Sequence, residues 1–367
     1  MRKIIVTNAD TLGRAVERPK IFAAGCRLAL AMALAALPNL TAIPARAEAP
    51  CTNVATVRVQ EWTGDIINIV PWIADAKGLF KKHCLDVKFV TLVSGPGSIT
   101  ALVSGSIEFA NGAPDSTIRP RSKGVDIRVT SNMYVGQWSA LVAGKQLALP
   151  HLDEGYPAVM KDLAGKKIGV TVLAGTTEAY VRSAFEGAGI GATSATYVAV
   201  GGVSTAVPAL TAGLVDAAIT GGVFPELAEA LGAGRIVLDY RKKGVGPETV
   251  QALRGATLCW NAYGPYVDKN PEVVAAFTQA NNEAIAWIQN PQNRNELYRV
   301  IGERMPLAIS LPNREETLKR IVDIHAGLLG VGVPRESIAG WNRYLLSLKQ
   351  IPSPIPYDEL VWKTGRP

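Results

Sequence analysis

The 367-residue sequence has few of the residues that most often carry catalysis or bind metals. It contains 3 histidines and 4 cysteines. The histidines, at positions 83, 151 and 325, lie far apart, and the cysteine spacing matches no zinc site. A histidine triad or a metal cluster is therefore hard to assemble, and we expect a protein without a metal or another cofactor.

The sequence also lacks an apolar run long enough to cross a membrane. Leu28–Leu37 has about 10 apolar residues, half of what a membrane-spanning helix needs. It follows a basic region and precedes Ala45–Ala47, a small-x-small cleavage site. We predict that residues 1–47 are a signal peptide cleaved near Ala47, and that the mature protein is soluble in the periplasm. A lipid anchor at Cys26 is disfavoured, because the apolar run follows this cysteine instead of preceding it.

The excess of positive charge belongs to this leader. Residues 1–47 hold 7 of the 38 Lys and Arg but only 2 of the 31 Asp and Glu. The remaining 31 basic and 29 acidic residues give a net charge of +2, although the full chain has a pI near 9.2. The mature chain thus shows no basic excess for a nucleic acid to bind, and we expect no nucleic-acid partner and a monomer.

Two stretches of the chain show the same alternation of strands and helices. Apolar and β-branched runs predict strands at 54–62, 86–93 and 107–110, and again at 167–172, 196–200 and 217–220. Turns rich in Gly, Ser and Thr precede the helices between them. This alternation predicts the α/β class, with mostly parallel sheets covered by helices on both faces.

The two stretches align with each other at a constant spacing in the chain. Residues 101–110 (AL..G.IE.A) match residues 209–218 (AL..G.VD.A). Each segment is predicted to contain a helix end, a capping glycine and a buried strand. Two similar lobes that face each other would enclose a cleft, because open α/β sheets bind ligands beyond the carboxyl ends of their strands.

Two apolar, strand-like segments flank the second stretch, at 139–145 and 255–263. We interpret them as the crossings between two lobes, since the mature chain exceeds the size of one ordinary domain. The first lobe is then expected to contain residues 52–138 and 262–367, and the second residues 139–261. The helical C-terminal third is expected to pack on the first lobe.

Three cysteines remain after cleavage, and an exported protein can form one disulfide. We predict that Cys51 pairs with Cys84 rather than either with Cys259, because both lie near the start of the first lobe. Three buried free thiols are the alternative.

Three helix starts are expected to face the cleft, at residues 94–98, 175–178 and 201–205. Their exposed N–H groups and the positive end of the helix dipole suit an anion, although Ser, Thr and Gly also serve simply as helix caps. The candidate ligand contacts in these turns are Ser94, Gly95, Gly97, Gly175, Thr176, Thr177 and Ser204.

Aromatic and polar residues near strand ends complete the expected site. Trp62, Trp138, Phe224 and Tyr134 could form an apolar wall, although an aromatic residue at a strand end is often core. The polar candidates are Thr63, Asn111 and Asp115, and an acid there either binds an amine of the ligand or complements a helix dipole. Arg119 is the nearest cation that could pair with an anionic ligand.

Five phrases in order resemble a known family of binding proteins. They are Ala76–Phe80 with Leu85–Val87, Ser94–Gly95 with Ala101–Leu102, Gly105–Phe109, Asp162–Val170 and Asn270–Val274. They are similar to the nitrate, sulfonate and taurine branch of ABC-importer binding proteins, the NMT1/THI5-like family, over nearly the whole mature chain. One departure is Cys84, where this family often has Gly.

The resemblance implies a type II periplasmic binding protein fold, in which two α/β lobes close on a small molecule. It also implies delivery of a small organic anion, of the sulfonate, taurine, nitrate or carboxylate class, to an ABC permease in the inner membrane. Binding of a pyrimidine-type thiamine precursor, a cofactor-free enzyme of the same fold, and a receptor that serves a sensor remain open. The enzymes carry a cysteine-rich motif that this chain lacks, so we expect no enzyme.

Overall fold

The computed structural model describes residues 51–92, 95–305 and 311–367. These residues belong to one compact unit, Ala49–Pro367. The predicted signal peptide, residues 1–47, lies outside the described residues.

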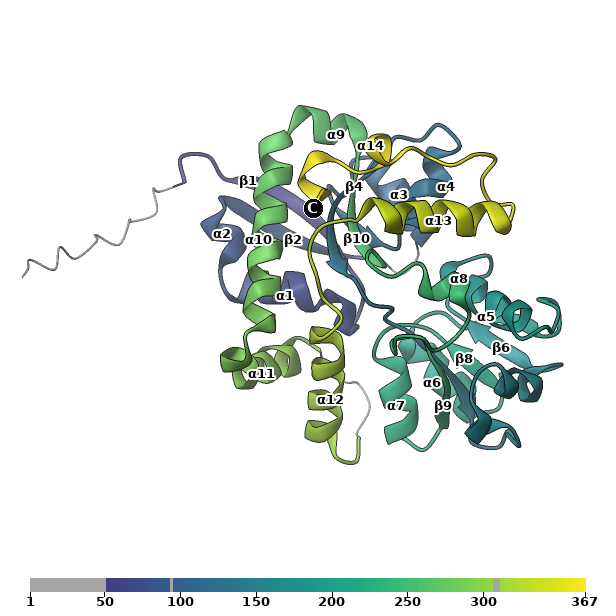
Figure 1. Ribbon diagram of the computed structural model, residues 1–367. Helices are drawn as coiled ribbons and strands as arrows, with labels where there is room; N and C mark the ends of the chain where they lie inside the picture. Colours follow the sequence, from purple (N-terminus) through teal and green to yellow (C-terminus); the bar gives the residue numbers. More distant parts are fainter. Residues whose placement is uncertain (1–50, 93–94, 306–310) are drawn as a thin grey trace, which may run out of the picture. The chain divides into compact units, whose positions relative to one another are not determined.

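Five strands form the framework of the first lobe (Figure 1). They are β1 (Ala55–Glu61), β2 (Leu85–Thr91), β3 (Ala110–Gly112), β4 (Ile127–Tyr134) and β10 (Leu258–Tyr263). Strand β1 pairs in parallel with β2, and β10 runs antiparallel between β3 and β4. A parallel bridge between Val59 and Phe109 joins the two groups, so the spatial order is β2-β1-β3-β10-β4.

The second lobe is built on a five-stranded sheet of the order β7-β6-β8-β5-β9. Its strands are β5 (Ala140–Gly144), β6 (Lys167–Val170), β7 (Thr196–Ala199), β8 (Ala217–Ile219) and β9 (Gly234–Asp239). Strands β7, β6 and β8 are parallel, whereas β5 is antiparallel to β8 and β9. Both lobes thus place one antiparallel strand in the fourth position of an otherwise parallel arrangement.

The repeat predicted from the sequence is confirmed in backbone detail. Gly105 and Gly213 end their helices with φ of +70° and +69°, the left-handed region that favours glycine. The following N–H groups, of Ser106 and Leu214, donate to the carbonyls of Ala101 and Ala209 at 2.8 and 2.9 Å. The same chain reversal therefore leads into β3 and β8.

Both segments predicted to cross between the lobes contain sheet strands instead. In 139–145, β5 pairs with β8 and β9 of the second lobe. In 255–263, β10 pairs with β3 and β4 of the first lobe. The chain changes lobes before it, between α8 (Glu248–Gln251) and Leu258, and in the other direction between Tyr134 and Ala140. A connecting strand and a central sheet strand are both extended and apolar, so the pattern alone cannot separate them.

Helices cover the sheets of both lobes (Figure 1). The helices of the first lobe that precede the crossing are α1 (Ile69–Ala76), α2 (Leu79–Lys82), α3 (Gly95–Val103) and α4 (Asp115–Arg121). Those of the second lobe are α5 (Thr176–Gly187), α6 (Val203–Thr211), α7 (Phe224–Ala230) and α8. The C-terminal third contains α9 (Gly264–Lys269), α10 (Pro271–Gln289), α11 (Arg294–Arg304), α12 (Arg314–Ala326), α13 (Arg335–Ser347) and α14 (Tyr357–Leu360).

The long helix α10 packs against α1 and α2, as expected for the C-terminal third. Its buried residues recur at helical spacing, including Val274, Phe277 and Ala284. The Phe277 ring stacks on Phe109 at a centroid distance of 3.9 Å and on Phe80 at 5.7 Å. This aromatic cluster packs α10 against the first sheet at Phe109, the residue immediately before β3.

The predicted Cys51–Cys84 disulfide is present, and Cys259 is a buried free thiol. Cys84 has φ of +58°, a conformation that a side chain adopts only at a cost. This position is the one where the similar family often has Gly. The backbone here therefore keeps the left-handed turn and holds a cysteine in it, bonded to the N-terminal segment.

Candidate functional site

A cavity of about 660 Å³ lies at the carboxyl ends of parallel strands from both lobes. Its wall follows β1, β2 and β3 in the first lobe, and β6, β7 and β8 in the second. Trp138 and Leu258, beside the crossings, complete it. This is where open α/β sheets bind ligands, and the volume lies in the range of pockets for small organic molecules.

Three helices begin in the cavity wall. Gly95 of α3, and Gly175 and Gly202 immediately before α5 and α6, all line the cavity. Gly175 and Gly202 are extended and give their helices no side-chain cap. The first N–H groups of a helix have no partner within it, and the dipole is positive there, so these turns suit a ligand rich in acceptor oxygens.

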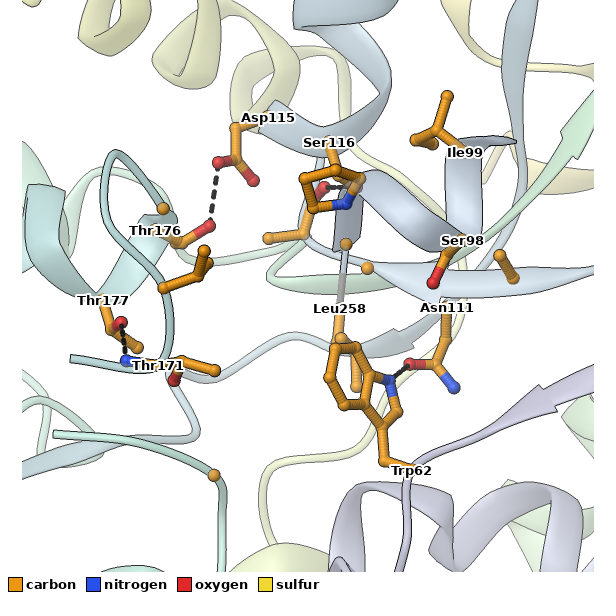
Figure 2. A pocket seen from close by; sticks show the side chains of 18 of the residues that line it. Trp62, Ser98, Ile99, Asn111, Asp115, Ser116, Thr171, Thr176, Thr177 and Leu258 are labelled. Carbon is orange, nitrogen blue, oxygen red and sulfur yellow. Dashed lines mark hydrogen bonds between the residues drawn. The ribbon is translucent and has the colours of Figure 1, made fainter. Parts of the chain in front are cut away.

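Trp62 and Asn111 form one wall of the cavity together (Figure 2). The indole Nε1 of Trp62 donates to Asn111 Oδ1 at 2.6 Å. An indole N–H only donates, so this bond fixes the orientation of the amide and leaves Nδ2 as its donor side. Nδ2 is buried and has no hydrogen-bond partner among the described residues.

Asp115 joins the two lobes at the cavity (Figure 2). Its Oδ2 accepts from the hydroxyl of Thr176 in the second lobe at 2.8 Å and pairs with Arg119 at 2.7 Å. Arg119 also donates to the carbonyl of Ala174 across the cleft at 3.1 Å. Asp115 Oδ1 is buried without a partner among the described residues.

A second contact between the lobes lies where Gly221 of the second lobe meets Asp65 of the first. Asp65 Oδ1 accepts the N–H of Ile67 at 3.2 Å, and Asp65 caps the short helical turn that precedes α1. A Cβ on Gly221 would lie 1.8 Å from Asp65 Oδ2, so only glycine fits. Burial raises the pKa of the Asp65 carboxyl to about 6, although hydrogen bonds from backbone N–H groups act in the opposite direction.

His325 of α12 continues this contact away from the cavity. Its Nε2 lies 3.1 Å from the carbonyl of Gly222, and its Nδ1 lies 3.1 Å from the hydroxyl of Tyr134. A carbonyl only accepts, so Nε2 carries the proton and Nδ1 of the neutral ring accepts from Tyr134. Burial lowers the pKa of the His325 imidazole to about 3.

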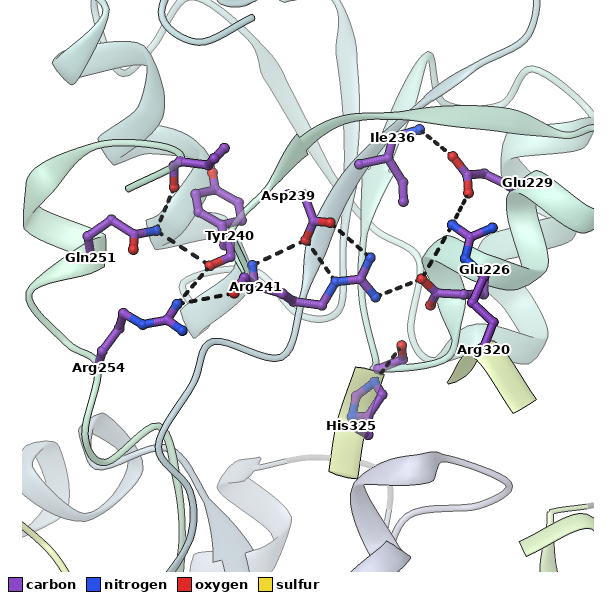
Figure 3. Close-up of polar contacts among 12 residues, drawn as sticks. Glu226, Glu229, Ile236, Asp239, Tyr240, Arg241, Gln251, Arg254, Arg320 and His325 are labelled. Atoms are coloured by element: carbon purple, nitrogen blue, oxygen red, sulfur yellow. Dashed lines mark hydrogen bonds and ion pairs between the residues drawn. The ribbon is translucent and has the colours of Figure 1, made fainter. Parts of the chain in front are cut away.

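Ion pairs extend the same contact between α7 and α12 (Figure 3). Arg320 of α12 pairs with Glu229 of α7 at 2.6 Å. Arg241 lies 2.8 Å from Glu226 and 2.7 Å from Asp239, and all three are buried. Burial raises the pKa of Glu226, against the effect of Arg241. Helix α12, which belongs to the C-terminal third, is thereby fixed to the second lobe.

The structure brings most of the predicted site residues to one cavity. The residues that line it are Trp62, Thr63, Gly95, Asn111, Asp115, Trp138, Gly175, Thr176, Thr177 and Ser204. Ser94 lies outside the described residues. That the ten residues contact a ligand stays a prediction.

Three predicted positions require correction. Phe224 is fully buried in the core at the start of α7 and does not line the cavity, because its apolar ring packs inward. Tyr134 is likewise fully buried, with its hydroxyl beside His325. Gly97 lies in the first turn of α3, but the wall there is formed by its neighbours Gly95, Pro96 and Ser98.

The sequence reasoning missed much of the apolar and polar wall. The missed lining residues include Ile99, Ser116, Lys123, Val125, Thr171, Val172, Leu173, Gly221, Leu258 and Asn261. Arg119, the cation expected nearest the site, also lines the cavity and pairs with Asp115 four residues earlier on the same helix face. Leu258 and Asn261 lie on β10, which was assigned to a crossing. The missed residues lack a local signal, since the fold alone brings them to the cavity.

The described residues contain no group of three or more His, Cys, Asp or Glu side chains that could hold a metal ion. Within the same part of the chain, no helix is both long and apolar enough to span a membrane.

The fold is that of the periplasmic binding proteins. The alkanesulfonate-binding protein SsuA of Xanthomonas axonopodis pv. citri, solved with MOPS, superimposes with a TM-score of 0.67 at 15% identity, over 85% of this chain and 99% of that one. The nitrate-binding protein NrtA of Synechocystis PCC 6803 gives 0.61 at 15% identity, over 82% and 83%. A Candida albicans protein with the generic periplasmic binding protein fold gives 0.62 at 14%, over 86% and 98%.

The chain belongs to the NMT1/THI5-like family, whose model matches residues 68–294. A curated relative in Brucella abortus (strain 2308), named as a binding protein, is 33% identical over 144 residues. The match spans 39% of this chain and 39% of the relative, so this chain matches well under half the length of its curated relatives.

Proposed function

We propose that this chain is the exported substrate-binding component of an ABC importer, which captures a small organic anion between its lobes. The observation that carries the proposal is the cavity of about 660 Å³, in which three helix N-termini open beside Trp62. The helix starts provide donors for a sulfonate or carboxylate, and the aromatic wall covers its apolar part. The volume favours an organic ligand over an ion as small as nitrate.

Family membership supports binding rather than catalysis. Among the described residues that line the cavity there is no histidine or cysteine, the side chains that most often serve as general base or nucleophile. We expect purified protein to return every bound compound with unchanged mass. A change in mass during incubation would favour an enzyme of the same fold.

A thermal-shift screen of sulfonates, carboxylates and taurine tests the ligand class. A compound at 100 times its dissociation constant should add about 2.7 kcal/mol to the free energy of unfolding. Light scattering should show a monomer, and X-ray scattering should show contraction when a ligand binds. If none of these compounds raises the melting temperature, the organic-anion proposal is wrong.

The Trp62→Ala variant tests whether this cavity is the site. Truncating a buried anchor should weaken binding of a ligand from the screen by about 1–3 kcal/mol. Trp287→Ala is the matched control, because Trp287 is partly buried elsewhere in the first lobe and does not line the cavity. Equal affinities of the two variants would place the site outside this cavity.

Delivery to a permease in the inner membrane forms the second part of the proposal. The ligand-loaded protein should stimulate ATP hydrolysis by its permease in membrane vesicles, and the ligand-free protein should do so less. Stimulation of a membrane kinase instead would favour service to a sensor.

A second candidate ligand is a pyrimidine-type thiamine precursor. The apolar wall around Trp62 favours it, because a flat ring can stack on an indole. An aminopyrimidine therefore belongs in the same screen.

A further inference from the structure

Four buried polar atoms of the cavity wall have no hydrogen-bond partner among the described residues. Nε and Nη2 of Arg119 belong to the guanidinium that forms the ion pair with Asp115. The other two are Asp115 Oδ1, an acceptor, and Asn111 Nδ2, a donor. Asp115 and Asn111 are 2% and 3% exposed, so water satisfies these side chains poorly. A buried polar group without a partner destabilises the structure, and a ligand that pairs with both atoms removes this cost.

The other polar atom of each side chain already has a partner, which fixes Asp115 Oδ1 as an acceptor and Asn111 Nδ2 as a donor. Asp115 Oδ2 accepts a hydrogen bond from Thr176 and forms an ion pair with Arg119. Asn111 Oδ1 accepts a hydrogen bond from the indole of Trp62. Asp115 therefore cannot turn its open oxygen away without breaking contacts to both lobes. Asn111 cannot exchange its oxygen and nitrogen, because two N–H donors would then face each other.

The charge around Asp115 favours a donor that need not be a cation. Arg119 lies 2.7 Å from the carboxylate and balances it. The positive ends of helix dipoles also face the cavity. Their field disfavours the binding of a bare cation but favours an anionic group elsewhere on the ligand. The open oxygen thus requires an N–H or O–H group.

We propose that the ligand of this cavity carries an N–H or O–H donor that binds Asp115 Oδ1 and an acceptor that binds Asn111 Nδ2. Asp115 is then the residue that distinguishes donor-bearing ligands from otherwise identical anions. This inference rests on the proposed function and narrows it, because simple sulfonates, carboxylates and nitrate offer acceptors only. Donor-free anions leave Asp115 Oδ1 buried and unpaired.

Matched ligand pairs test the proposal on the full mature protein. We suggest 4-aminobenzenesulfonate against benzenesulfonate, 4-hydroxybenzoate against benzoate, and taurine against ethanesulfonate, measured by calorimetry. Each pair differs by one donor group. In at least one pair the donor-bearing member should bind about tenfold more tightly or better, since its partner leaves a buried acceptor unpaired.

The Asp115→Asn variant should reduce this preference to less than about threefold, with a smaller change in the affinity for the donor-free member. Ser122→Ala is the control, because Ser122 follows the same helix, does not line the cavity and donates to the carbonyl of Arg119 at 2.8 Å. Its preference should equal that of the wild type. Asn111→Asp keeps the acceptor for Trp62 and replaces Nδ2 with an oxygen. It should therefore weaken the binding of both ligands in a pair and leave the ratio of their affinities unchanged.

The outcomes separate the two proposals. Equal affinity of both members in every pair that binds overturns the donor requirement and leaves the organic-anion function intact. A preference that persists in a folded Asp115→Asn protein overturns the role of Asp115, and the wild-type comparison decides the donor requirement even if that variant does not fold. Absence of binding by all six compounds contradicts the organic-anion function itself.

Discussion

The two lobes share a strand order but present different chemistry to the cavity. The first lobe contributes the large or charged side chains, such as Trp62, Asn111 and Asp115. The second contributes mainly glycines, hydroxyls, aliphatic side chains and two of the three helix N-termini, in residues 171–177 and 202–204. The repeated topology therefore positions two walls, and the side chains make them unequal.

This difference predicts a division of roles. Changes in the first wall should alter which ligand binds, because its buried polar atoms have fixed donor and acceptor roles. Changes in the second wall should alter how tightly every ligand binds, because backbone N–H groups accept any suitably placed oxygen.

The largest expected effect is on the free energy of unfolding and comes from the disulfide, which among the described residues lies in the first lobe. The Cys51–Cys84 disulfide joins residues 33 apart at the start of the β1–β2 pair, whereas the equivalent β6–β7 pair has no disulfide. Loop-closure entropy for this separation corresponds to about 3–4 kcal/mol. Cys51→Ser should lower the free energy of unfolding by about this amount in urea denaturation.

The control is the wild type with reductant, which should match Cys51→Ser. In the reduced background, Cys84→Gly should be more stable than Cys84→Ser by about 1 kcal/mol, because φ of +58° costs a side chain but not glycine. Equal stability of oxidised and reduced protein would show that the bond contributes nothing.

The next effect breaks the contact between the two walls. Gly221→Ala places a Cβ against the buried, hydrogen-bonded carboxyl of Asp65 and should cost about 1–3 kcal/mol of stability. X-ray scattering should also show a larger radius of gyration. Gly202→Ala is the matched control, because no atom lies within 4 Å of its added Cβ. Equal behaviour of the two variants would contradict the close approach of Gly221 to Asp65.

A pH effect should appear at the contact of His325 with Gly222. Because burial lowers the pKa of folded His325 to about 3, its contribution to stability is complete above the unfolded pKa of about 6.5 and is lost as the pH falls toward 3. Relative to His325→Gln, the wild type should lose about 1.4 kcal/mol per pH unit between about pH 6 and pH 4. Urea denaturation at several pH values measures this slope.

Asp65 acts in the opposite direction, since its raised pKa destabilises the folded protein as the pH rises through about 6. This contribution is present in both proteins and cancels in the difference. Parallel pH profiles of the wild type and His325→Gln would show that His325 titrates as it does in water.

The smallest effect is expected in the second wall. Thr176→Ala removes the donor to Asp115 Oδ2 and should weaken binding of each ligand by about 1 kcal/mol. The order of affinities should not change, because the ion pair with Arg119 still holds Asp115 in place. Thr205→Ala is the control, because its hydroxyl bonds to carbonyls within the second lobe and it does not line the cavity. A changed order of affinities in Thr176→Ala would contradict the division between the walls.

The sequence alone determined the features that depend on local pattern. The strands, the long C-terminal helices and the repeat at 101–110 and 209–218 follow from apolar periodicity and capping glycines. Ligands bind at the carboxyl ends of the strands in such sheets, so the turns after the predicted strands were expected to form the site. Most of the candidate residues in these turns line the cavity. For the cysteines, the sequence left open a Cys51–Cys84 pair and buried free thiols, and the structure shows the pair.

Only the tertiary structure decided which apolar and polar groups meet. The sequence pattern of β10 also fits a crossing, and only its pairing with β3 and β4 places it in the first sheet. Phe224 at a strand end also fits a cavity wall, and only its full burial places it in the core. The open atoms of Asp115 and Asn111 depend on Thr176, Arg119 and Trp62, which lie elsewhere in the chain. Hydrogen-bond satisfaction is set by three-dimensional neighbours, and local sequence does not contain it.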